Sequence, residues 1–244
     1  MEQESSQPLR GQRVVVIGGS SGIGLTTAQR CAAAGASIVI ASRQRSNLAK
    51  AAQAIGGDVE THALDFTRER KVERLFRRIG RFDHLVITAA QGAAGRFLEL
   101  DTQRVRNLFE DKFWGQHHCA KHGAPHMSET GSITFFSSLV SRRAFDQLSA
   151  MGAANGAIES LTKTLALELA PRRVNVVLPG AIDSPAHDWM TPEARRAWCE
   201  KMAARTVMGR LGTCEDVAQV VLFLIRNPYV TGQVVVVDGG HSLL

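Results

Sequence analysis

Cysteine is scarce in this chain of 244 residues. The four cysteines, Cys31, Cys119, Cys199 and Cys214, lie far apart and form no C-x-x-C pair. The sequence therefore indicates neither a disulfide framework nor a zinc knuckle, and a reducing, cytoplasmic setting is expected.

Long apolar runs are also missing. No stretch approaches the roughly 18 apolar residues that a membrane-spanning helix needs, and the polar start MEQESSQPLR lacks the apolar core of a signal peptide. We expect a soluble protein without a membrane partner.

The charge excess is small, with 29 Lys and Arg against 23 Asp and Glu. Basic and acidic residues alternate in DFTRERKVERLFRRIGRFD, a pattern typical of a solvated helix face. No nucleic-acid partner is therefore expected.

What the chain does contain is a regular alternation of short β-branched runs and amphipathic segments. With 44% hydrophobic residues it can bury one core, so we expect one α/β domain over residues 11–244 after a flexible segment at 1–10. The alternation predicts a parallel sheet with helices on both faces. The strands are expected at 13–18, 37–41, 59–64, 84–88, 132–137, 173–179 and 233–238.

The longest stretch without strand character is residues 180–212. A segment of that length inside a compact domain is typical of a functional lid. Thr213 and Asp216 form a T-x-x-D capping box that predicts a helix start for EDVAQVVLFLI.

A glycine-rich turn follows the first predicted strand in VVVIGGSSGIGLTTAQR. Gly18, Gly22 and Gly24 allow a tight turn and a close ligand approach, and the helix behind them offers free N–H groups and a positive dipole end. This arrangement at the first strand–helix junction predicts a pyrophosphate site.

Together with other motifs, this glycine-rich turn makes the chain resemble the short-chain dehydrogenase/reductase family from Gly11 to Leu243. The resemblance rests on GGSSGIG, ALDFT, NVVLPGAIDSP and TGQVVVVDGG, although Gly18 replaces a usual Thr and VITAAQG replaces a usual Asn-Asn-Ala-Gly run. It implies a Rossmann-type, doubly wound sheet of seven parallel strands. It also implies homotetramers or homodimers built through residues 101–124, 148–170 and the C-terminal strand.

The resemblance further implies a dinucleotide site, with Asp65 at the adenine and with Ile182 and Ser184 at the nicotinamide carboxamide. After the second strand, ASRQR offers no carboxylate for a ribose 2′-hydroxyl, whereas Arg43 and Arg45 can pair with a 2′-phosphate. NADP(H) is thus favoured over NAD(H), unless both arginines are simply solvated. The complete expected set is Gly18, Ser20, Ser21, Gly22, Ile23, Gly24, Ser42, Arg43, Arg45, Asp65, Phe66, Ala89, Ala90, Lys112, Pro179, Gly180, Ile182 and Ser184.

The catalytic positions depart from the family. Its enzymes use a serine, a tyrosine, a lysine four residues later, and an asparagine on a neighbouring helix. Here Ser138 matches the serine, but Met151 and Asn155 occupy the tyrosine and lysine positions, and Lys112 occupies the asparagine position. The sole tyrosine, Tyr229, lies at a position that the family does not use.

Helical phase places Lys112 and Asn155 on core-facing stripes. Val105, Leu108, Phe109, Lys112 and Gln116 share one stripe. We hypothesise a reciprocal exchange that keeps one cation and one amide beside the nicotinamide ribose, with Lys112 meeting Asn155. Alternatively, the lysine stem extends to solvent. Met151 is expected to fill core space.

Two other residue patterns are weak evidence for a function, one for a metal site and one for a hydrolase. His118, His122 and His126 have helical spacing, but Pro125 interrupts their face and no metal site is expected. Ser138 lacks a G-x-S-x-G elbow, which disfavours a hydrolase.

We therefore expect an atypical NADP(H)-dependent oxidoreductase, with Ser138, Lys112 and Asn155 as its catalytic set. Its substrate is a small carbonyl, alcohol or activated alkene, which Trp189, Met190 and Trp198 of the lid suggest to be apolar or aromatic. The alternative is a relative without redox chemistry, namely a dehydratase, an isomerase or a nucleotide-sensing binding protein.

Overall fold

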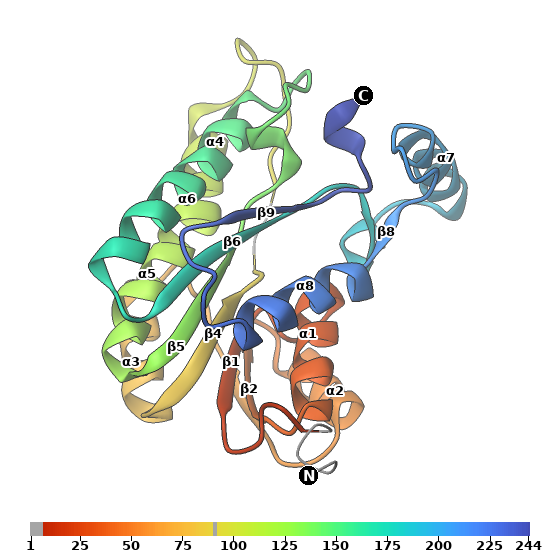
Figure 1. The fold of residues 1–244 in the computed structure, drawn as a ribbon. Coiled ribbons are helices and arrows are strands. Elements are labelled where there is room, and N and C mark those ends of the chain that lie inside the picture. Colours follow the sequence, from red (N-terminus) through yellow and green to blue (C-terminus); the bar gives the residue numbers. More distant parts are fainter. Residues whose placement is uncertain (1–6, 90–91) are drawn as a thin grey trace.

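The computed structural model describes residues 7–89 and 92–244, and its centre is the expected seven-stranded sheet (Figure 1). The strand order is β3-β2-β1-β4-β5-β6-β9, and every neighbouring pair is parallel. The strands are β1 (Arg13–Ile17), β2 (Ser37–Ser42), β3 (Val59–Ala63), β4 (Phe82–Ile87), β5 (Met127–Phe136), β6 (Arg173–Pro179) and β9 (Val234–Val237).

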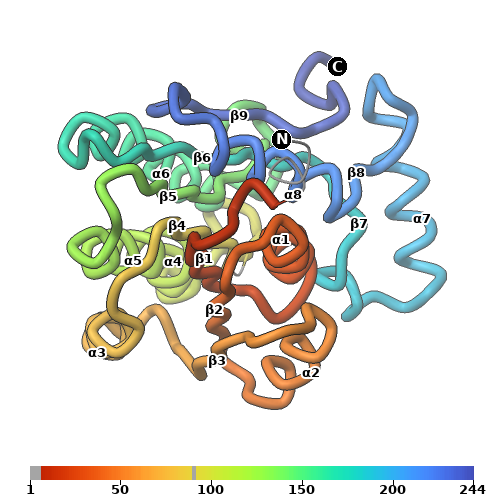
Figure 2. The backbone as a smooth tube through the Cα atoms, turned by 60° about the horizontal axis from the view of Figure 1, so that its bottom comes forward, coloured from red at the N-terminus to blue at the C-terminus, as the bar shows by residue number. Residues whose placement is uncertain are grey.

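Helices cover both faces of this sheet (Figure 2). On one side lie α1 (Gly22–Ala33), α2 (Arg45–Ile55) and α8 (Cys214–Arg226). On the other lie α3 (Glu69–Ile79), α4 (Thr102–Phe109), α5 (Gly115–Gly123) and α6 (Ser149–Glu168). The three-layer α/β architecture expected from the alternation of segments is confirmed.

Each central strand supplies both layers of the core. In β1, Val14 and Val16 belong to the cluster under α1 and α8, whereas Val15 and Ile17 belong to the cluster under α3 and α5. Successive side chains of a strand point to opposite faces, so a strand covered on both sides is apolar throughout. This explains the uninterrupted run VVVI.

The sheet order reverses direction at β1, which lies between β2 and β4. The chain moves outward from β1 to β3 and then returns to start the second half at β4. Loops after β1 and β4 therefore diverge at the carboxyl edge and leave a crevice, the usual place for a ligand in an open α/β sheet.

The ordered core begins before Gly11, in contrast to the expected boundary at residue 10. Leu9 is 1% exposed and belongs to the cluster under α1. Its backbone N–H donates to the Ala34 carbonyl at 2.8 Å. A single apolar residue in a polar segment gives no periodic signal, so the sequence pattern does not reveal that Leu9 is buried.

The predicted lid contains its own small framework. Two short strands, β7 (Ile182–Asp183) and β8 (Gly212–Thr213), pair in parallel and bring its two ends together. Between them lies α7 (Pro192–Ala203), none of whose residues is buried. Figure 1 shows α7 projecting beyond the sheet.

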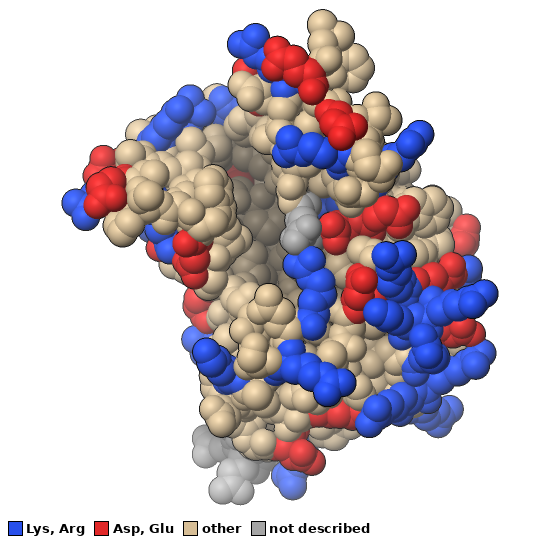
Figure 3. Space-filling model, turned by 180° about the vertical axis from the view of Figure 1, so that it is seen from behind, with Lys and Arg blue, Asp and Glu red and all other residues tan. Residues whose placement is uncertain are grey.

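Two surface properties follow from the described residues. None of their helices combines the length and the apolar character needed to traverse a bilayer. Figure 3 shows Lys and Arg gathered on the side formed by α3, where Val72, Leu75 and Phe76 face the core and the basic side chains are exposed.

Candidate active site

The glycine-rich turn joins β1 to α1. Gly18 has a φ of +91°, and a Cβ on it would lie 2.6 Å from the Thr88 hydroxyl. A Cβ on Gly24 would lie 2.3 Å from the Gly18 carbonyl oxygen. Only glycines permit this left-handed turn and this contact between turn and helix. Ser21 precedes α1, and its side chain does not cap the helix, so the first-turn N–H groups suit an anion.

A cavity of about 390 Å³ opens beside this turn. Its wall includes many of the residues expected to hold a dinucleotide: Gly18, Ser20, Ser21, Gly22, Ile23, Gly24, Ser42, Arg43, Phe66, Ala89 and Ser184. The cradle formed by the turn, the uncapped α1 terminus and the Arg43 guanidinium suits a phosphate-rich ligand.

Several expected residues are not on this wall. Arg45, Lys112, Pro179, Gly180 and Ile182 are absent from the lining, and Ala90 lies outside the described residues. Asp65 is also absent, because its carboxylate accepts from the Thr67 hydroxyl at 2.7 Å and the Thr67 N–H at 3.3 Å. Gly180 is instead packed against Asp238, where a Cβ would lie 2.7 Å from the Asp238 Cβ.

Sequence reasoning also missed part of the wall. Gln44, Asn47 and Asp111 contribute polar side chains, and the remaining lining residues are Ile17, Ala41, Leu64, Thr88, Pro185 and Ala186. Gln44 and Asn47 were detectable because they flank Arg43 at the start of α2. Asp111 had no local signal, since it comes from a distant helix.

The predicted helix over residues 101–124 is interrupted by a π-helical turn, η1 (Glu110–Trp114), between α4 and α5. Lys112 lies in this turn and is only 8% exposed, so its stem does not extend to solvent. Burial lowers the pKa of Lys112 from its ordinary value of 10.5 to about 8. Such bulges often occur at functional sites.

Gln116 ties this turn to the sheet. Its Nε2 donates to the Lys112 carbonyl at 2.9 Å and to the Phe136 carbonyl at 3.0 Å, and its Oε1 accepts from the Phe136 N–H at 3.0 Å. All three contacts are buried. Gln116 therefore holds the backbone of Lys112 at a set distance from the end of β5.

Asn155 lies on α6, which packs against the π turn. Asn155 is fully buried, and its Nδ2 donates to the Met151 carbonyl at 2.8 Å. Its Oδ1 is buried and has no hydrogen-bond partner in the described structure. The expected hydrogen bond from Lys112 is therefore not formed, because the amide is tied along its own helix. The elements of Lys112 and Asn155 do meet, and both side chains are buried.

The serine region contains a network that the sequence did not predict. Ser138 is half-buried, and its carbonyl accepts from the Ser141 hydroxyl at 2.8 Å. Glu159, one turn beyond Asn155 on α6, is 6% exposed. It accepts from Ser137 Oγ at 3.1 Å, from Arg142 Nε at 2.6 Å, and from Ser141 Oγ. This buried carboxylate fixes the loop that follows Ser138 to α6.

Met151 and Tyr229 lie in different surroundings. Met151 is half-buried, and its Sδ lies 3.5 Å from the Cβ position of Gly92. It thus packs against the loop after β4, consistent with the space-filling role expected for it. Tyr229, in the connection between α8 and β9, is 97% exposed.

The titratable lid residues His187 and Asp188 have structural partners. The His187 ring packs against Trp198 in a tilted arrangement, with 4.1 Å between the ring centroids. Arg195 forms ion pairs with the carboxylates of Asp188 at 2.6 Å and Asp183 at 2.7 Å. Trp189 is 79% exposed. Figure 3 shows a deep hollow between the α7 lobe and the body of the molecule.

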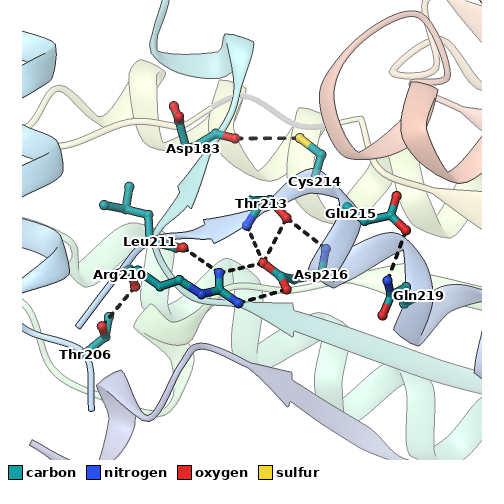
Figure 4. Close-up of polar contacts among 9 residues, drawn as sticks. All are labelled: Asp183, Thr206, Arg210, Leu211, Thr213, Cys214, Glu215, Asp216 and Gln219. Carbon is teal, nitrogen blue, oxygen red and sulfur yellow. Dashed lines mark hydrogen bonds and ion pairs between the residues drawn. The ribbon is translucent and has the colours of Figure 1, made fainter. Parts of the chain in front are cut away.

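A capping box anchors the end of the lid (Figure 4). Thr213 Oγ1 accepts from the Asp216 N–H at 3.1 Å, and Asp216 Oδ2 accepts from the Thr213 N–H at 2.8 Å, as the sequence predicted. Arg210 adds an ion pair with Asp216 at 2.8 Å. The hydrogen bonds from Arg210 and Thr213 hold the pKa of Asp216 well below its usual range. Cys214 directs its Sγ toward the Asp183 carbonyl at 3.8 Å.

Two histidine side chains of α5 lie near a glutamate of α3. His122 Nε2 lies 3.0 Å from Glu69 Oε1, and Lys121 Nζ lies 2.9 Å from the same oxygen. Pro125 lies in a 3₁₀ turn that follows α5. Within residues 7–89 and 92–244, no group of three or more His, Cys, Asp or Glu side chains is arranged to hold a metal ion.

Comparison with known proteins connects this geometry to a family. The model described as enoyl-(acyl carrier protein) reductase matches residues 17–242. A short-chain dehydrogenase/reductase of Stachybotrys chlorohalonatus is 31% identical, with 96% of this chain and 98% of that protein covered. Carbonyl reductase family member 4 of Danio rerio is 33% identical, with coverages of 94% and 98%.

Solved structures agree with this result. A small-chain dehydrogenase in complex with NADPH is 34% identical and superposes with a TM-score of 0.84, covering 96% of this chain and 99% of that one. The likeness extends over the sheet, both helical layers and the lid.

Proposed function

Because the chain belongs to the short-chain dehydrogenase/reductase family, we propose that it is an NADP(H)-dependent oxidoreductase with a non-standard catalytic set. Its substrate is a small molecule with a carbonyl, an alcohol or an activated double bond. The observation that carries the proposal is the cavity beside the glycine turn, with Arg43 in its wall. The NADPH complex of a similar dehydrogenase supports the choice of cofactor.

The residues of this chain fit such a cofactor. The uncapped first turn of α1 and the hydroxyls of Ser20 and Ser21 suit the pyrophosphate, and Arg43 suits a 2′-phosphate. Ser184 and Ala89 lie on the same wall, where the nicotinamide half would be held. When bound, the nicotinamide supplies or accepts the hydride.

Lys112 is proposed as the proton donor for carbonyl reduction. A donor with a pKa of about 8 is largely protonated at neutral pH and releases its proton readily. The neighbouring residue Asp111 lines the cavity, so the π turn borders the proposed cofactor site. The reductive rate is expected to fall as the pH rises through about 8, because the ammonium form is then lost.

Ser138 and Asn155 complete the proposed set. Ser138 orients the substrate carbonyl through its hydroxyl. The buried Oδ1 of Asn155 has no partner in the described structure, and an unsatisfied buried acceptor costs about 1–3 kcal/mol. A hydroxyl of the nicotinamide ribose would satisfy this oxygen.

The substrate is proposed to be apolar or aromatic. Trp189, Val207 and Met208 are exposed in and beside the lid, at 79%, 58% and 65%. Exposed apolar side chains around a hollow favour an apolar ligand.

The test combines binding with turnover. Purified protein is titrated with NADPH and NADH, and NADPH oxidation is then followed with a panel of aromatic ketones, aldehydes and enones. Saturable NADPH binding with one NADPH oxidised for each substrate reduced is expected. Lys112→Met should retain binding and lose about 10²- to 10⁴-fold in turnover, the usual size of acid–base assistance.

The alternative is a protein without redox chemistry. It is favoured by one observation, namely that the chain's sole tyrosine is exposed on the α8–β9 connection. Binding without turnover would support a nucleotide-sensing protein, and substrate conversion without NADPH oxidation would support a dehydratase or isomerase. A Lys112→Met variant with full activity would refute the proposed donor.

We also propose a homodimer or homotetramer through α5 and α6. A groove of about 450 Å³ lies between these helices, with Ala120, Pro125, Leu165 and Leu169 in its wall. The wall also includes His117, Lys121, Glu168 and Arg172, so its apolar centre with a charged surround is suitable for contact with a second copy.

A further inference from the structure

The part of the cavity that follows β2 has an acidic residue in its wall. Arg43, directly after β2, and Asp111, from the π turn η1, both line the cavity. Arg43 is exposed, whereas Asp111 is half-buried. The sequence after β2 offers no carboxylate, but the fold supplies one from another element.

These two side chains interact electrostatically. Burial raises the pKa of Asp111, the charge of Arg43 opposes this rise, and Asp65 and Glu110 add to it. Both Arg43 and Asp111 therefore have interactions in the folded chain. Arg43 lies in the field of a carboxylate that shares its cavity wall, and is not an isolated anion receptor.

This arrangement affects two kinds of adenosine ligand in opposite ways. A 2′-phosphate attracted to Arg43 must compete with the Asp111 carboxylate and is repelled by its charge. A ribose with a free 2′-hydroxyl carries a donor, for which a carboxylate is a strong acceptor. Asp111 thus opposes the preference that Arg43 creates.

Resting on the proposed cofactor site, we propose that Asp111 is a specificity-determining residue that reduces the discrimination between NADP(H) and NAD(H). Arg43 favours the phosphorylated ligand and Asp111 favours the unphosphorylated one. The chain is therefore able to bind both, with a modest preference for NADP(H).

The test uses ligands that contain only the adenosine half. Adenosine 2′,5′-bisphosphate and adenosine 5′-monophosphate are titrated by calorimetry into the wild type and Asp111→Asn, at one fixed salt concentration. Asp111→Asn removes the charge with little change of shape. It should bind the bisphosphate about tenfold more tightly and the monophosphate a few-fold more weakly. NADPH and NADH, followed by nicotinamide fluorescence, should shift in the same directions.

The matched control is Glu110→Gln. Glu110 neighbours Asp111 and also acts on it electrostatically, but it is exposed and does not line the cavity. In Glu110→Gln, the ratio of the affinities for the bisphosphate and the monophosphate should change less than about twofold.

The outcomes separate two failures. An unchanged affinity ratio in a folded Asp111→Asn protein that binds NADPH overturns this inference and leaves the proposed function standing. Failure of the wild type to bind either dinucleotide overturns both.

Discussion

The glycine turn and the helix pair of Lys112 and Asn155, which we propose to serve one site, are built in different ways. At the turn the backbone is closely packed: a Cβ on Gly18, Gly19 or Gly24 would lie within 2.6 Å of a neighbouring atom. At the helix pair, polar side chains are buried, and an amide oxygen has no partner among the described residues. The turn is thus defined by the shape of the backbone, whereas the helix pair retains buried polar groups at a cost in stability. The predictions below test that contrast.

The largest effect is expected at the turn. Gly24→Ala would place a Cβ 2.3 Å from the Gly18 carbonyl oxygen. The clash should destabilise the fold by roughly 3 kcal/mol and weaken NADPH binding by more than about 100-fold, measured by thermal unfolding and fluorescence titration. Gly156→Ala is the control, since nothing lies within 4 Å of its Cβ position on α6. It should stabilise the helix by up to about 1 kcal/mol. Equal behaviour of the two variants would argue against a backbone-defined site.

The second effect concerns Gln116, whose side chain ties the π turn to β5. Gln116→Leu keeps the approximate volume but leaves the Lys112 carbonyl and both polar groups of Phe136 without the side-chain contacts seen here. The free energy of unfolding should fall by roughly 2–3 kcal/mol. Gln219→Leu removes one hydrogen bond on the exposed face of α8 and should change stability by less than about 0.5 kcal/mol. Denaturant titration measures the free energy of unfolding of both variants. A loss for Gln116→Leu as small as that of the control would show that the Gln116 hydrogen bonds do not stabilise the fold.

The third prediction uses the burial of Lys112. Its folded-state pKa of about 8 lies below its ordinary value of 10.5, so the unfolded chain binds the proton more strongly. Wild-type stability should therefore rise as the pH increases from about 8 to 10.5. Lys112→Met should be more stable at pH 7 by roughly 3–3.5 kcal/mol, and it should lack the alkaline rise.

Thermal unfolding across this pH range checks that prediction. For a chain of this size, the gain corresponds to an increase in Tm of roughly 6–14 °C. Lys50→Met, at an exposed position on α2, should change stability by less than about 0.5 kcal/mol. A wild type whose stability does not change between pH 8 and 10 would contradict the depressed pKa.

Most of the fold could be predicted from local patterns. The strand VVVI is apolar because both faces of the sheet are covered, and the capping box at Thr213 and Asp216 forms between neighbours in the chain. Core-facing spacing also predicted the burial of Lys112. The π turn was not predictable, because its sequence EDKFW carries no signal that separates it from an ordinary helical turn.

In the candidate site, too, the features formed by neighbouring residues could be predicted from the sequence, and those formed by distant residues could not. The glycine turn is a local motif, so its contribution to the cavity followed from spacing alone. Glu159 had no such signal, since its partners Ser137, Ser141 and Arg142 come from the loop after β5. The lack of a hydrogen-bond partner for Asn155 Oδ1 could likewise not be predicted from the sequence, because it depends on which groups surround the buried amide.

The sequence alone determined the family resemblance, the strand–helix alternation, the phosphate turn and the identities of Ser138, Met151 and Asn155. These are properties of residues close together in the chain, where backbone geometry and periodicity govern the outcome. Only the tertiary structure decided that Asp111 shares a cavity wall with Arg43, and that the side chains of Lys112 and Asn155 do not bond to each other. Charge and hydrogen bonding act through space, and the packing of distant elements sets the distances on which they depend.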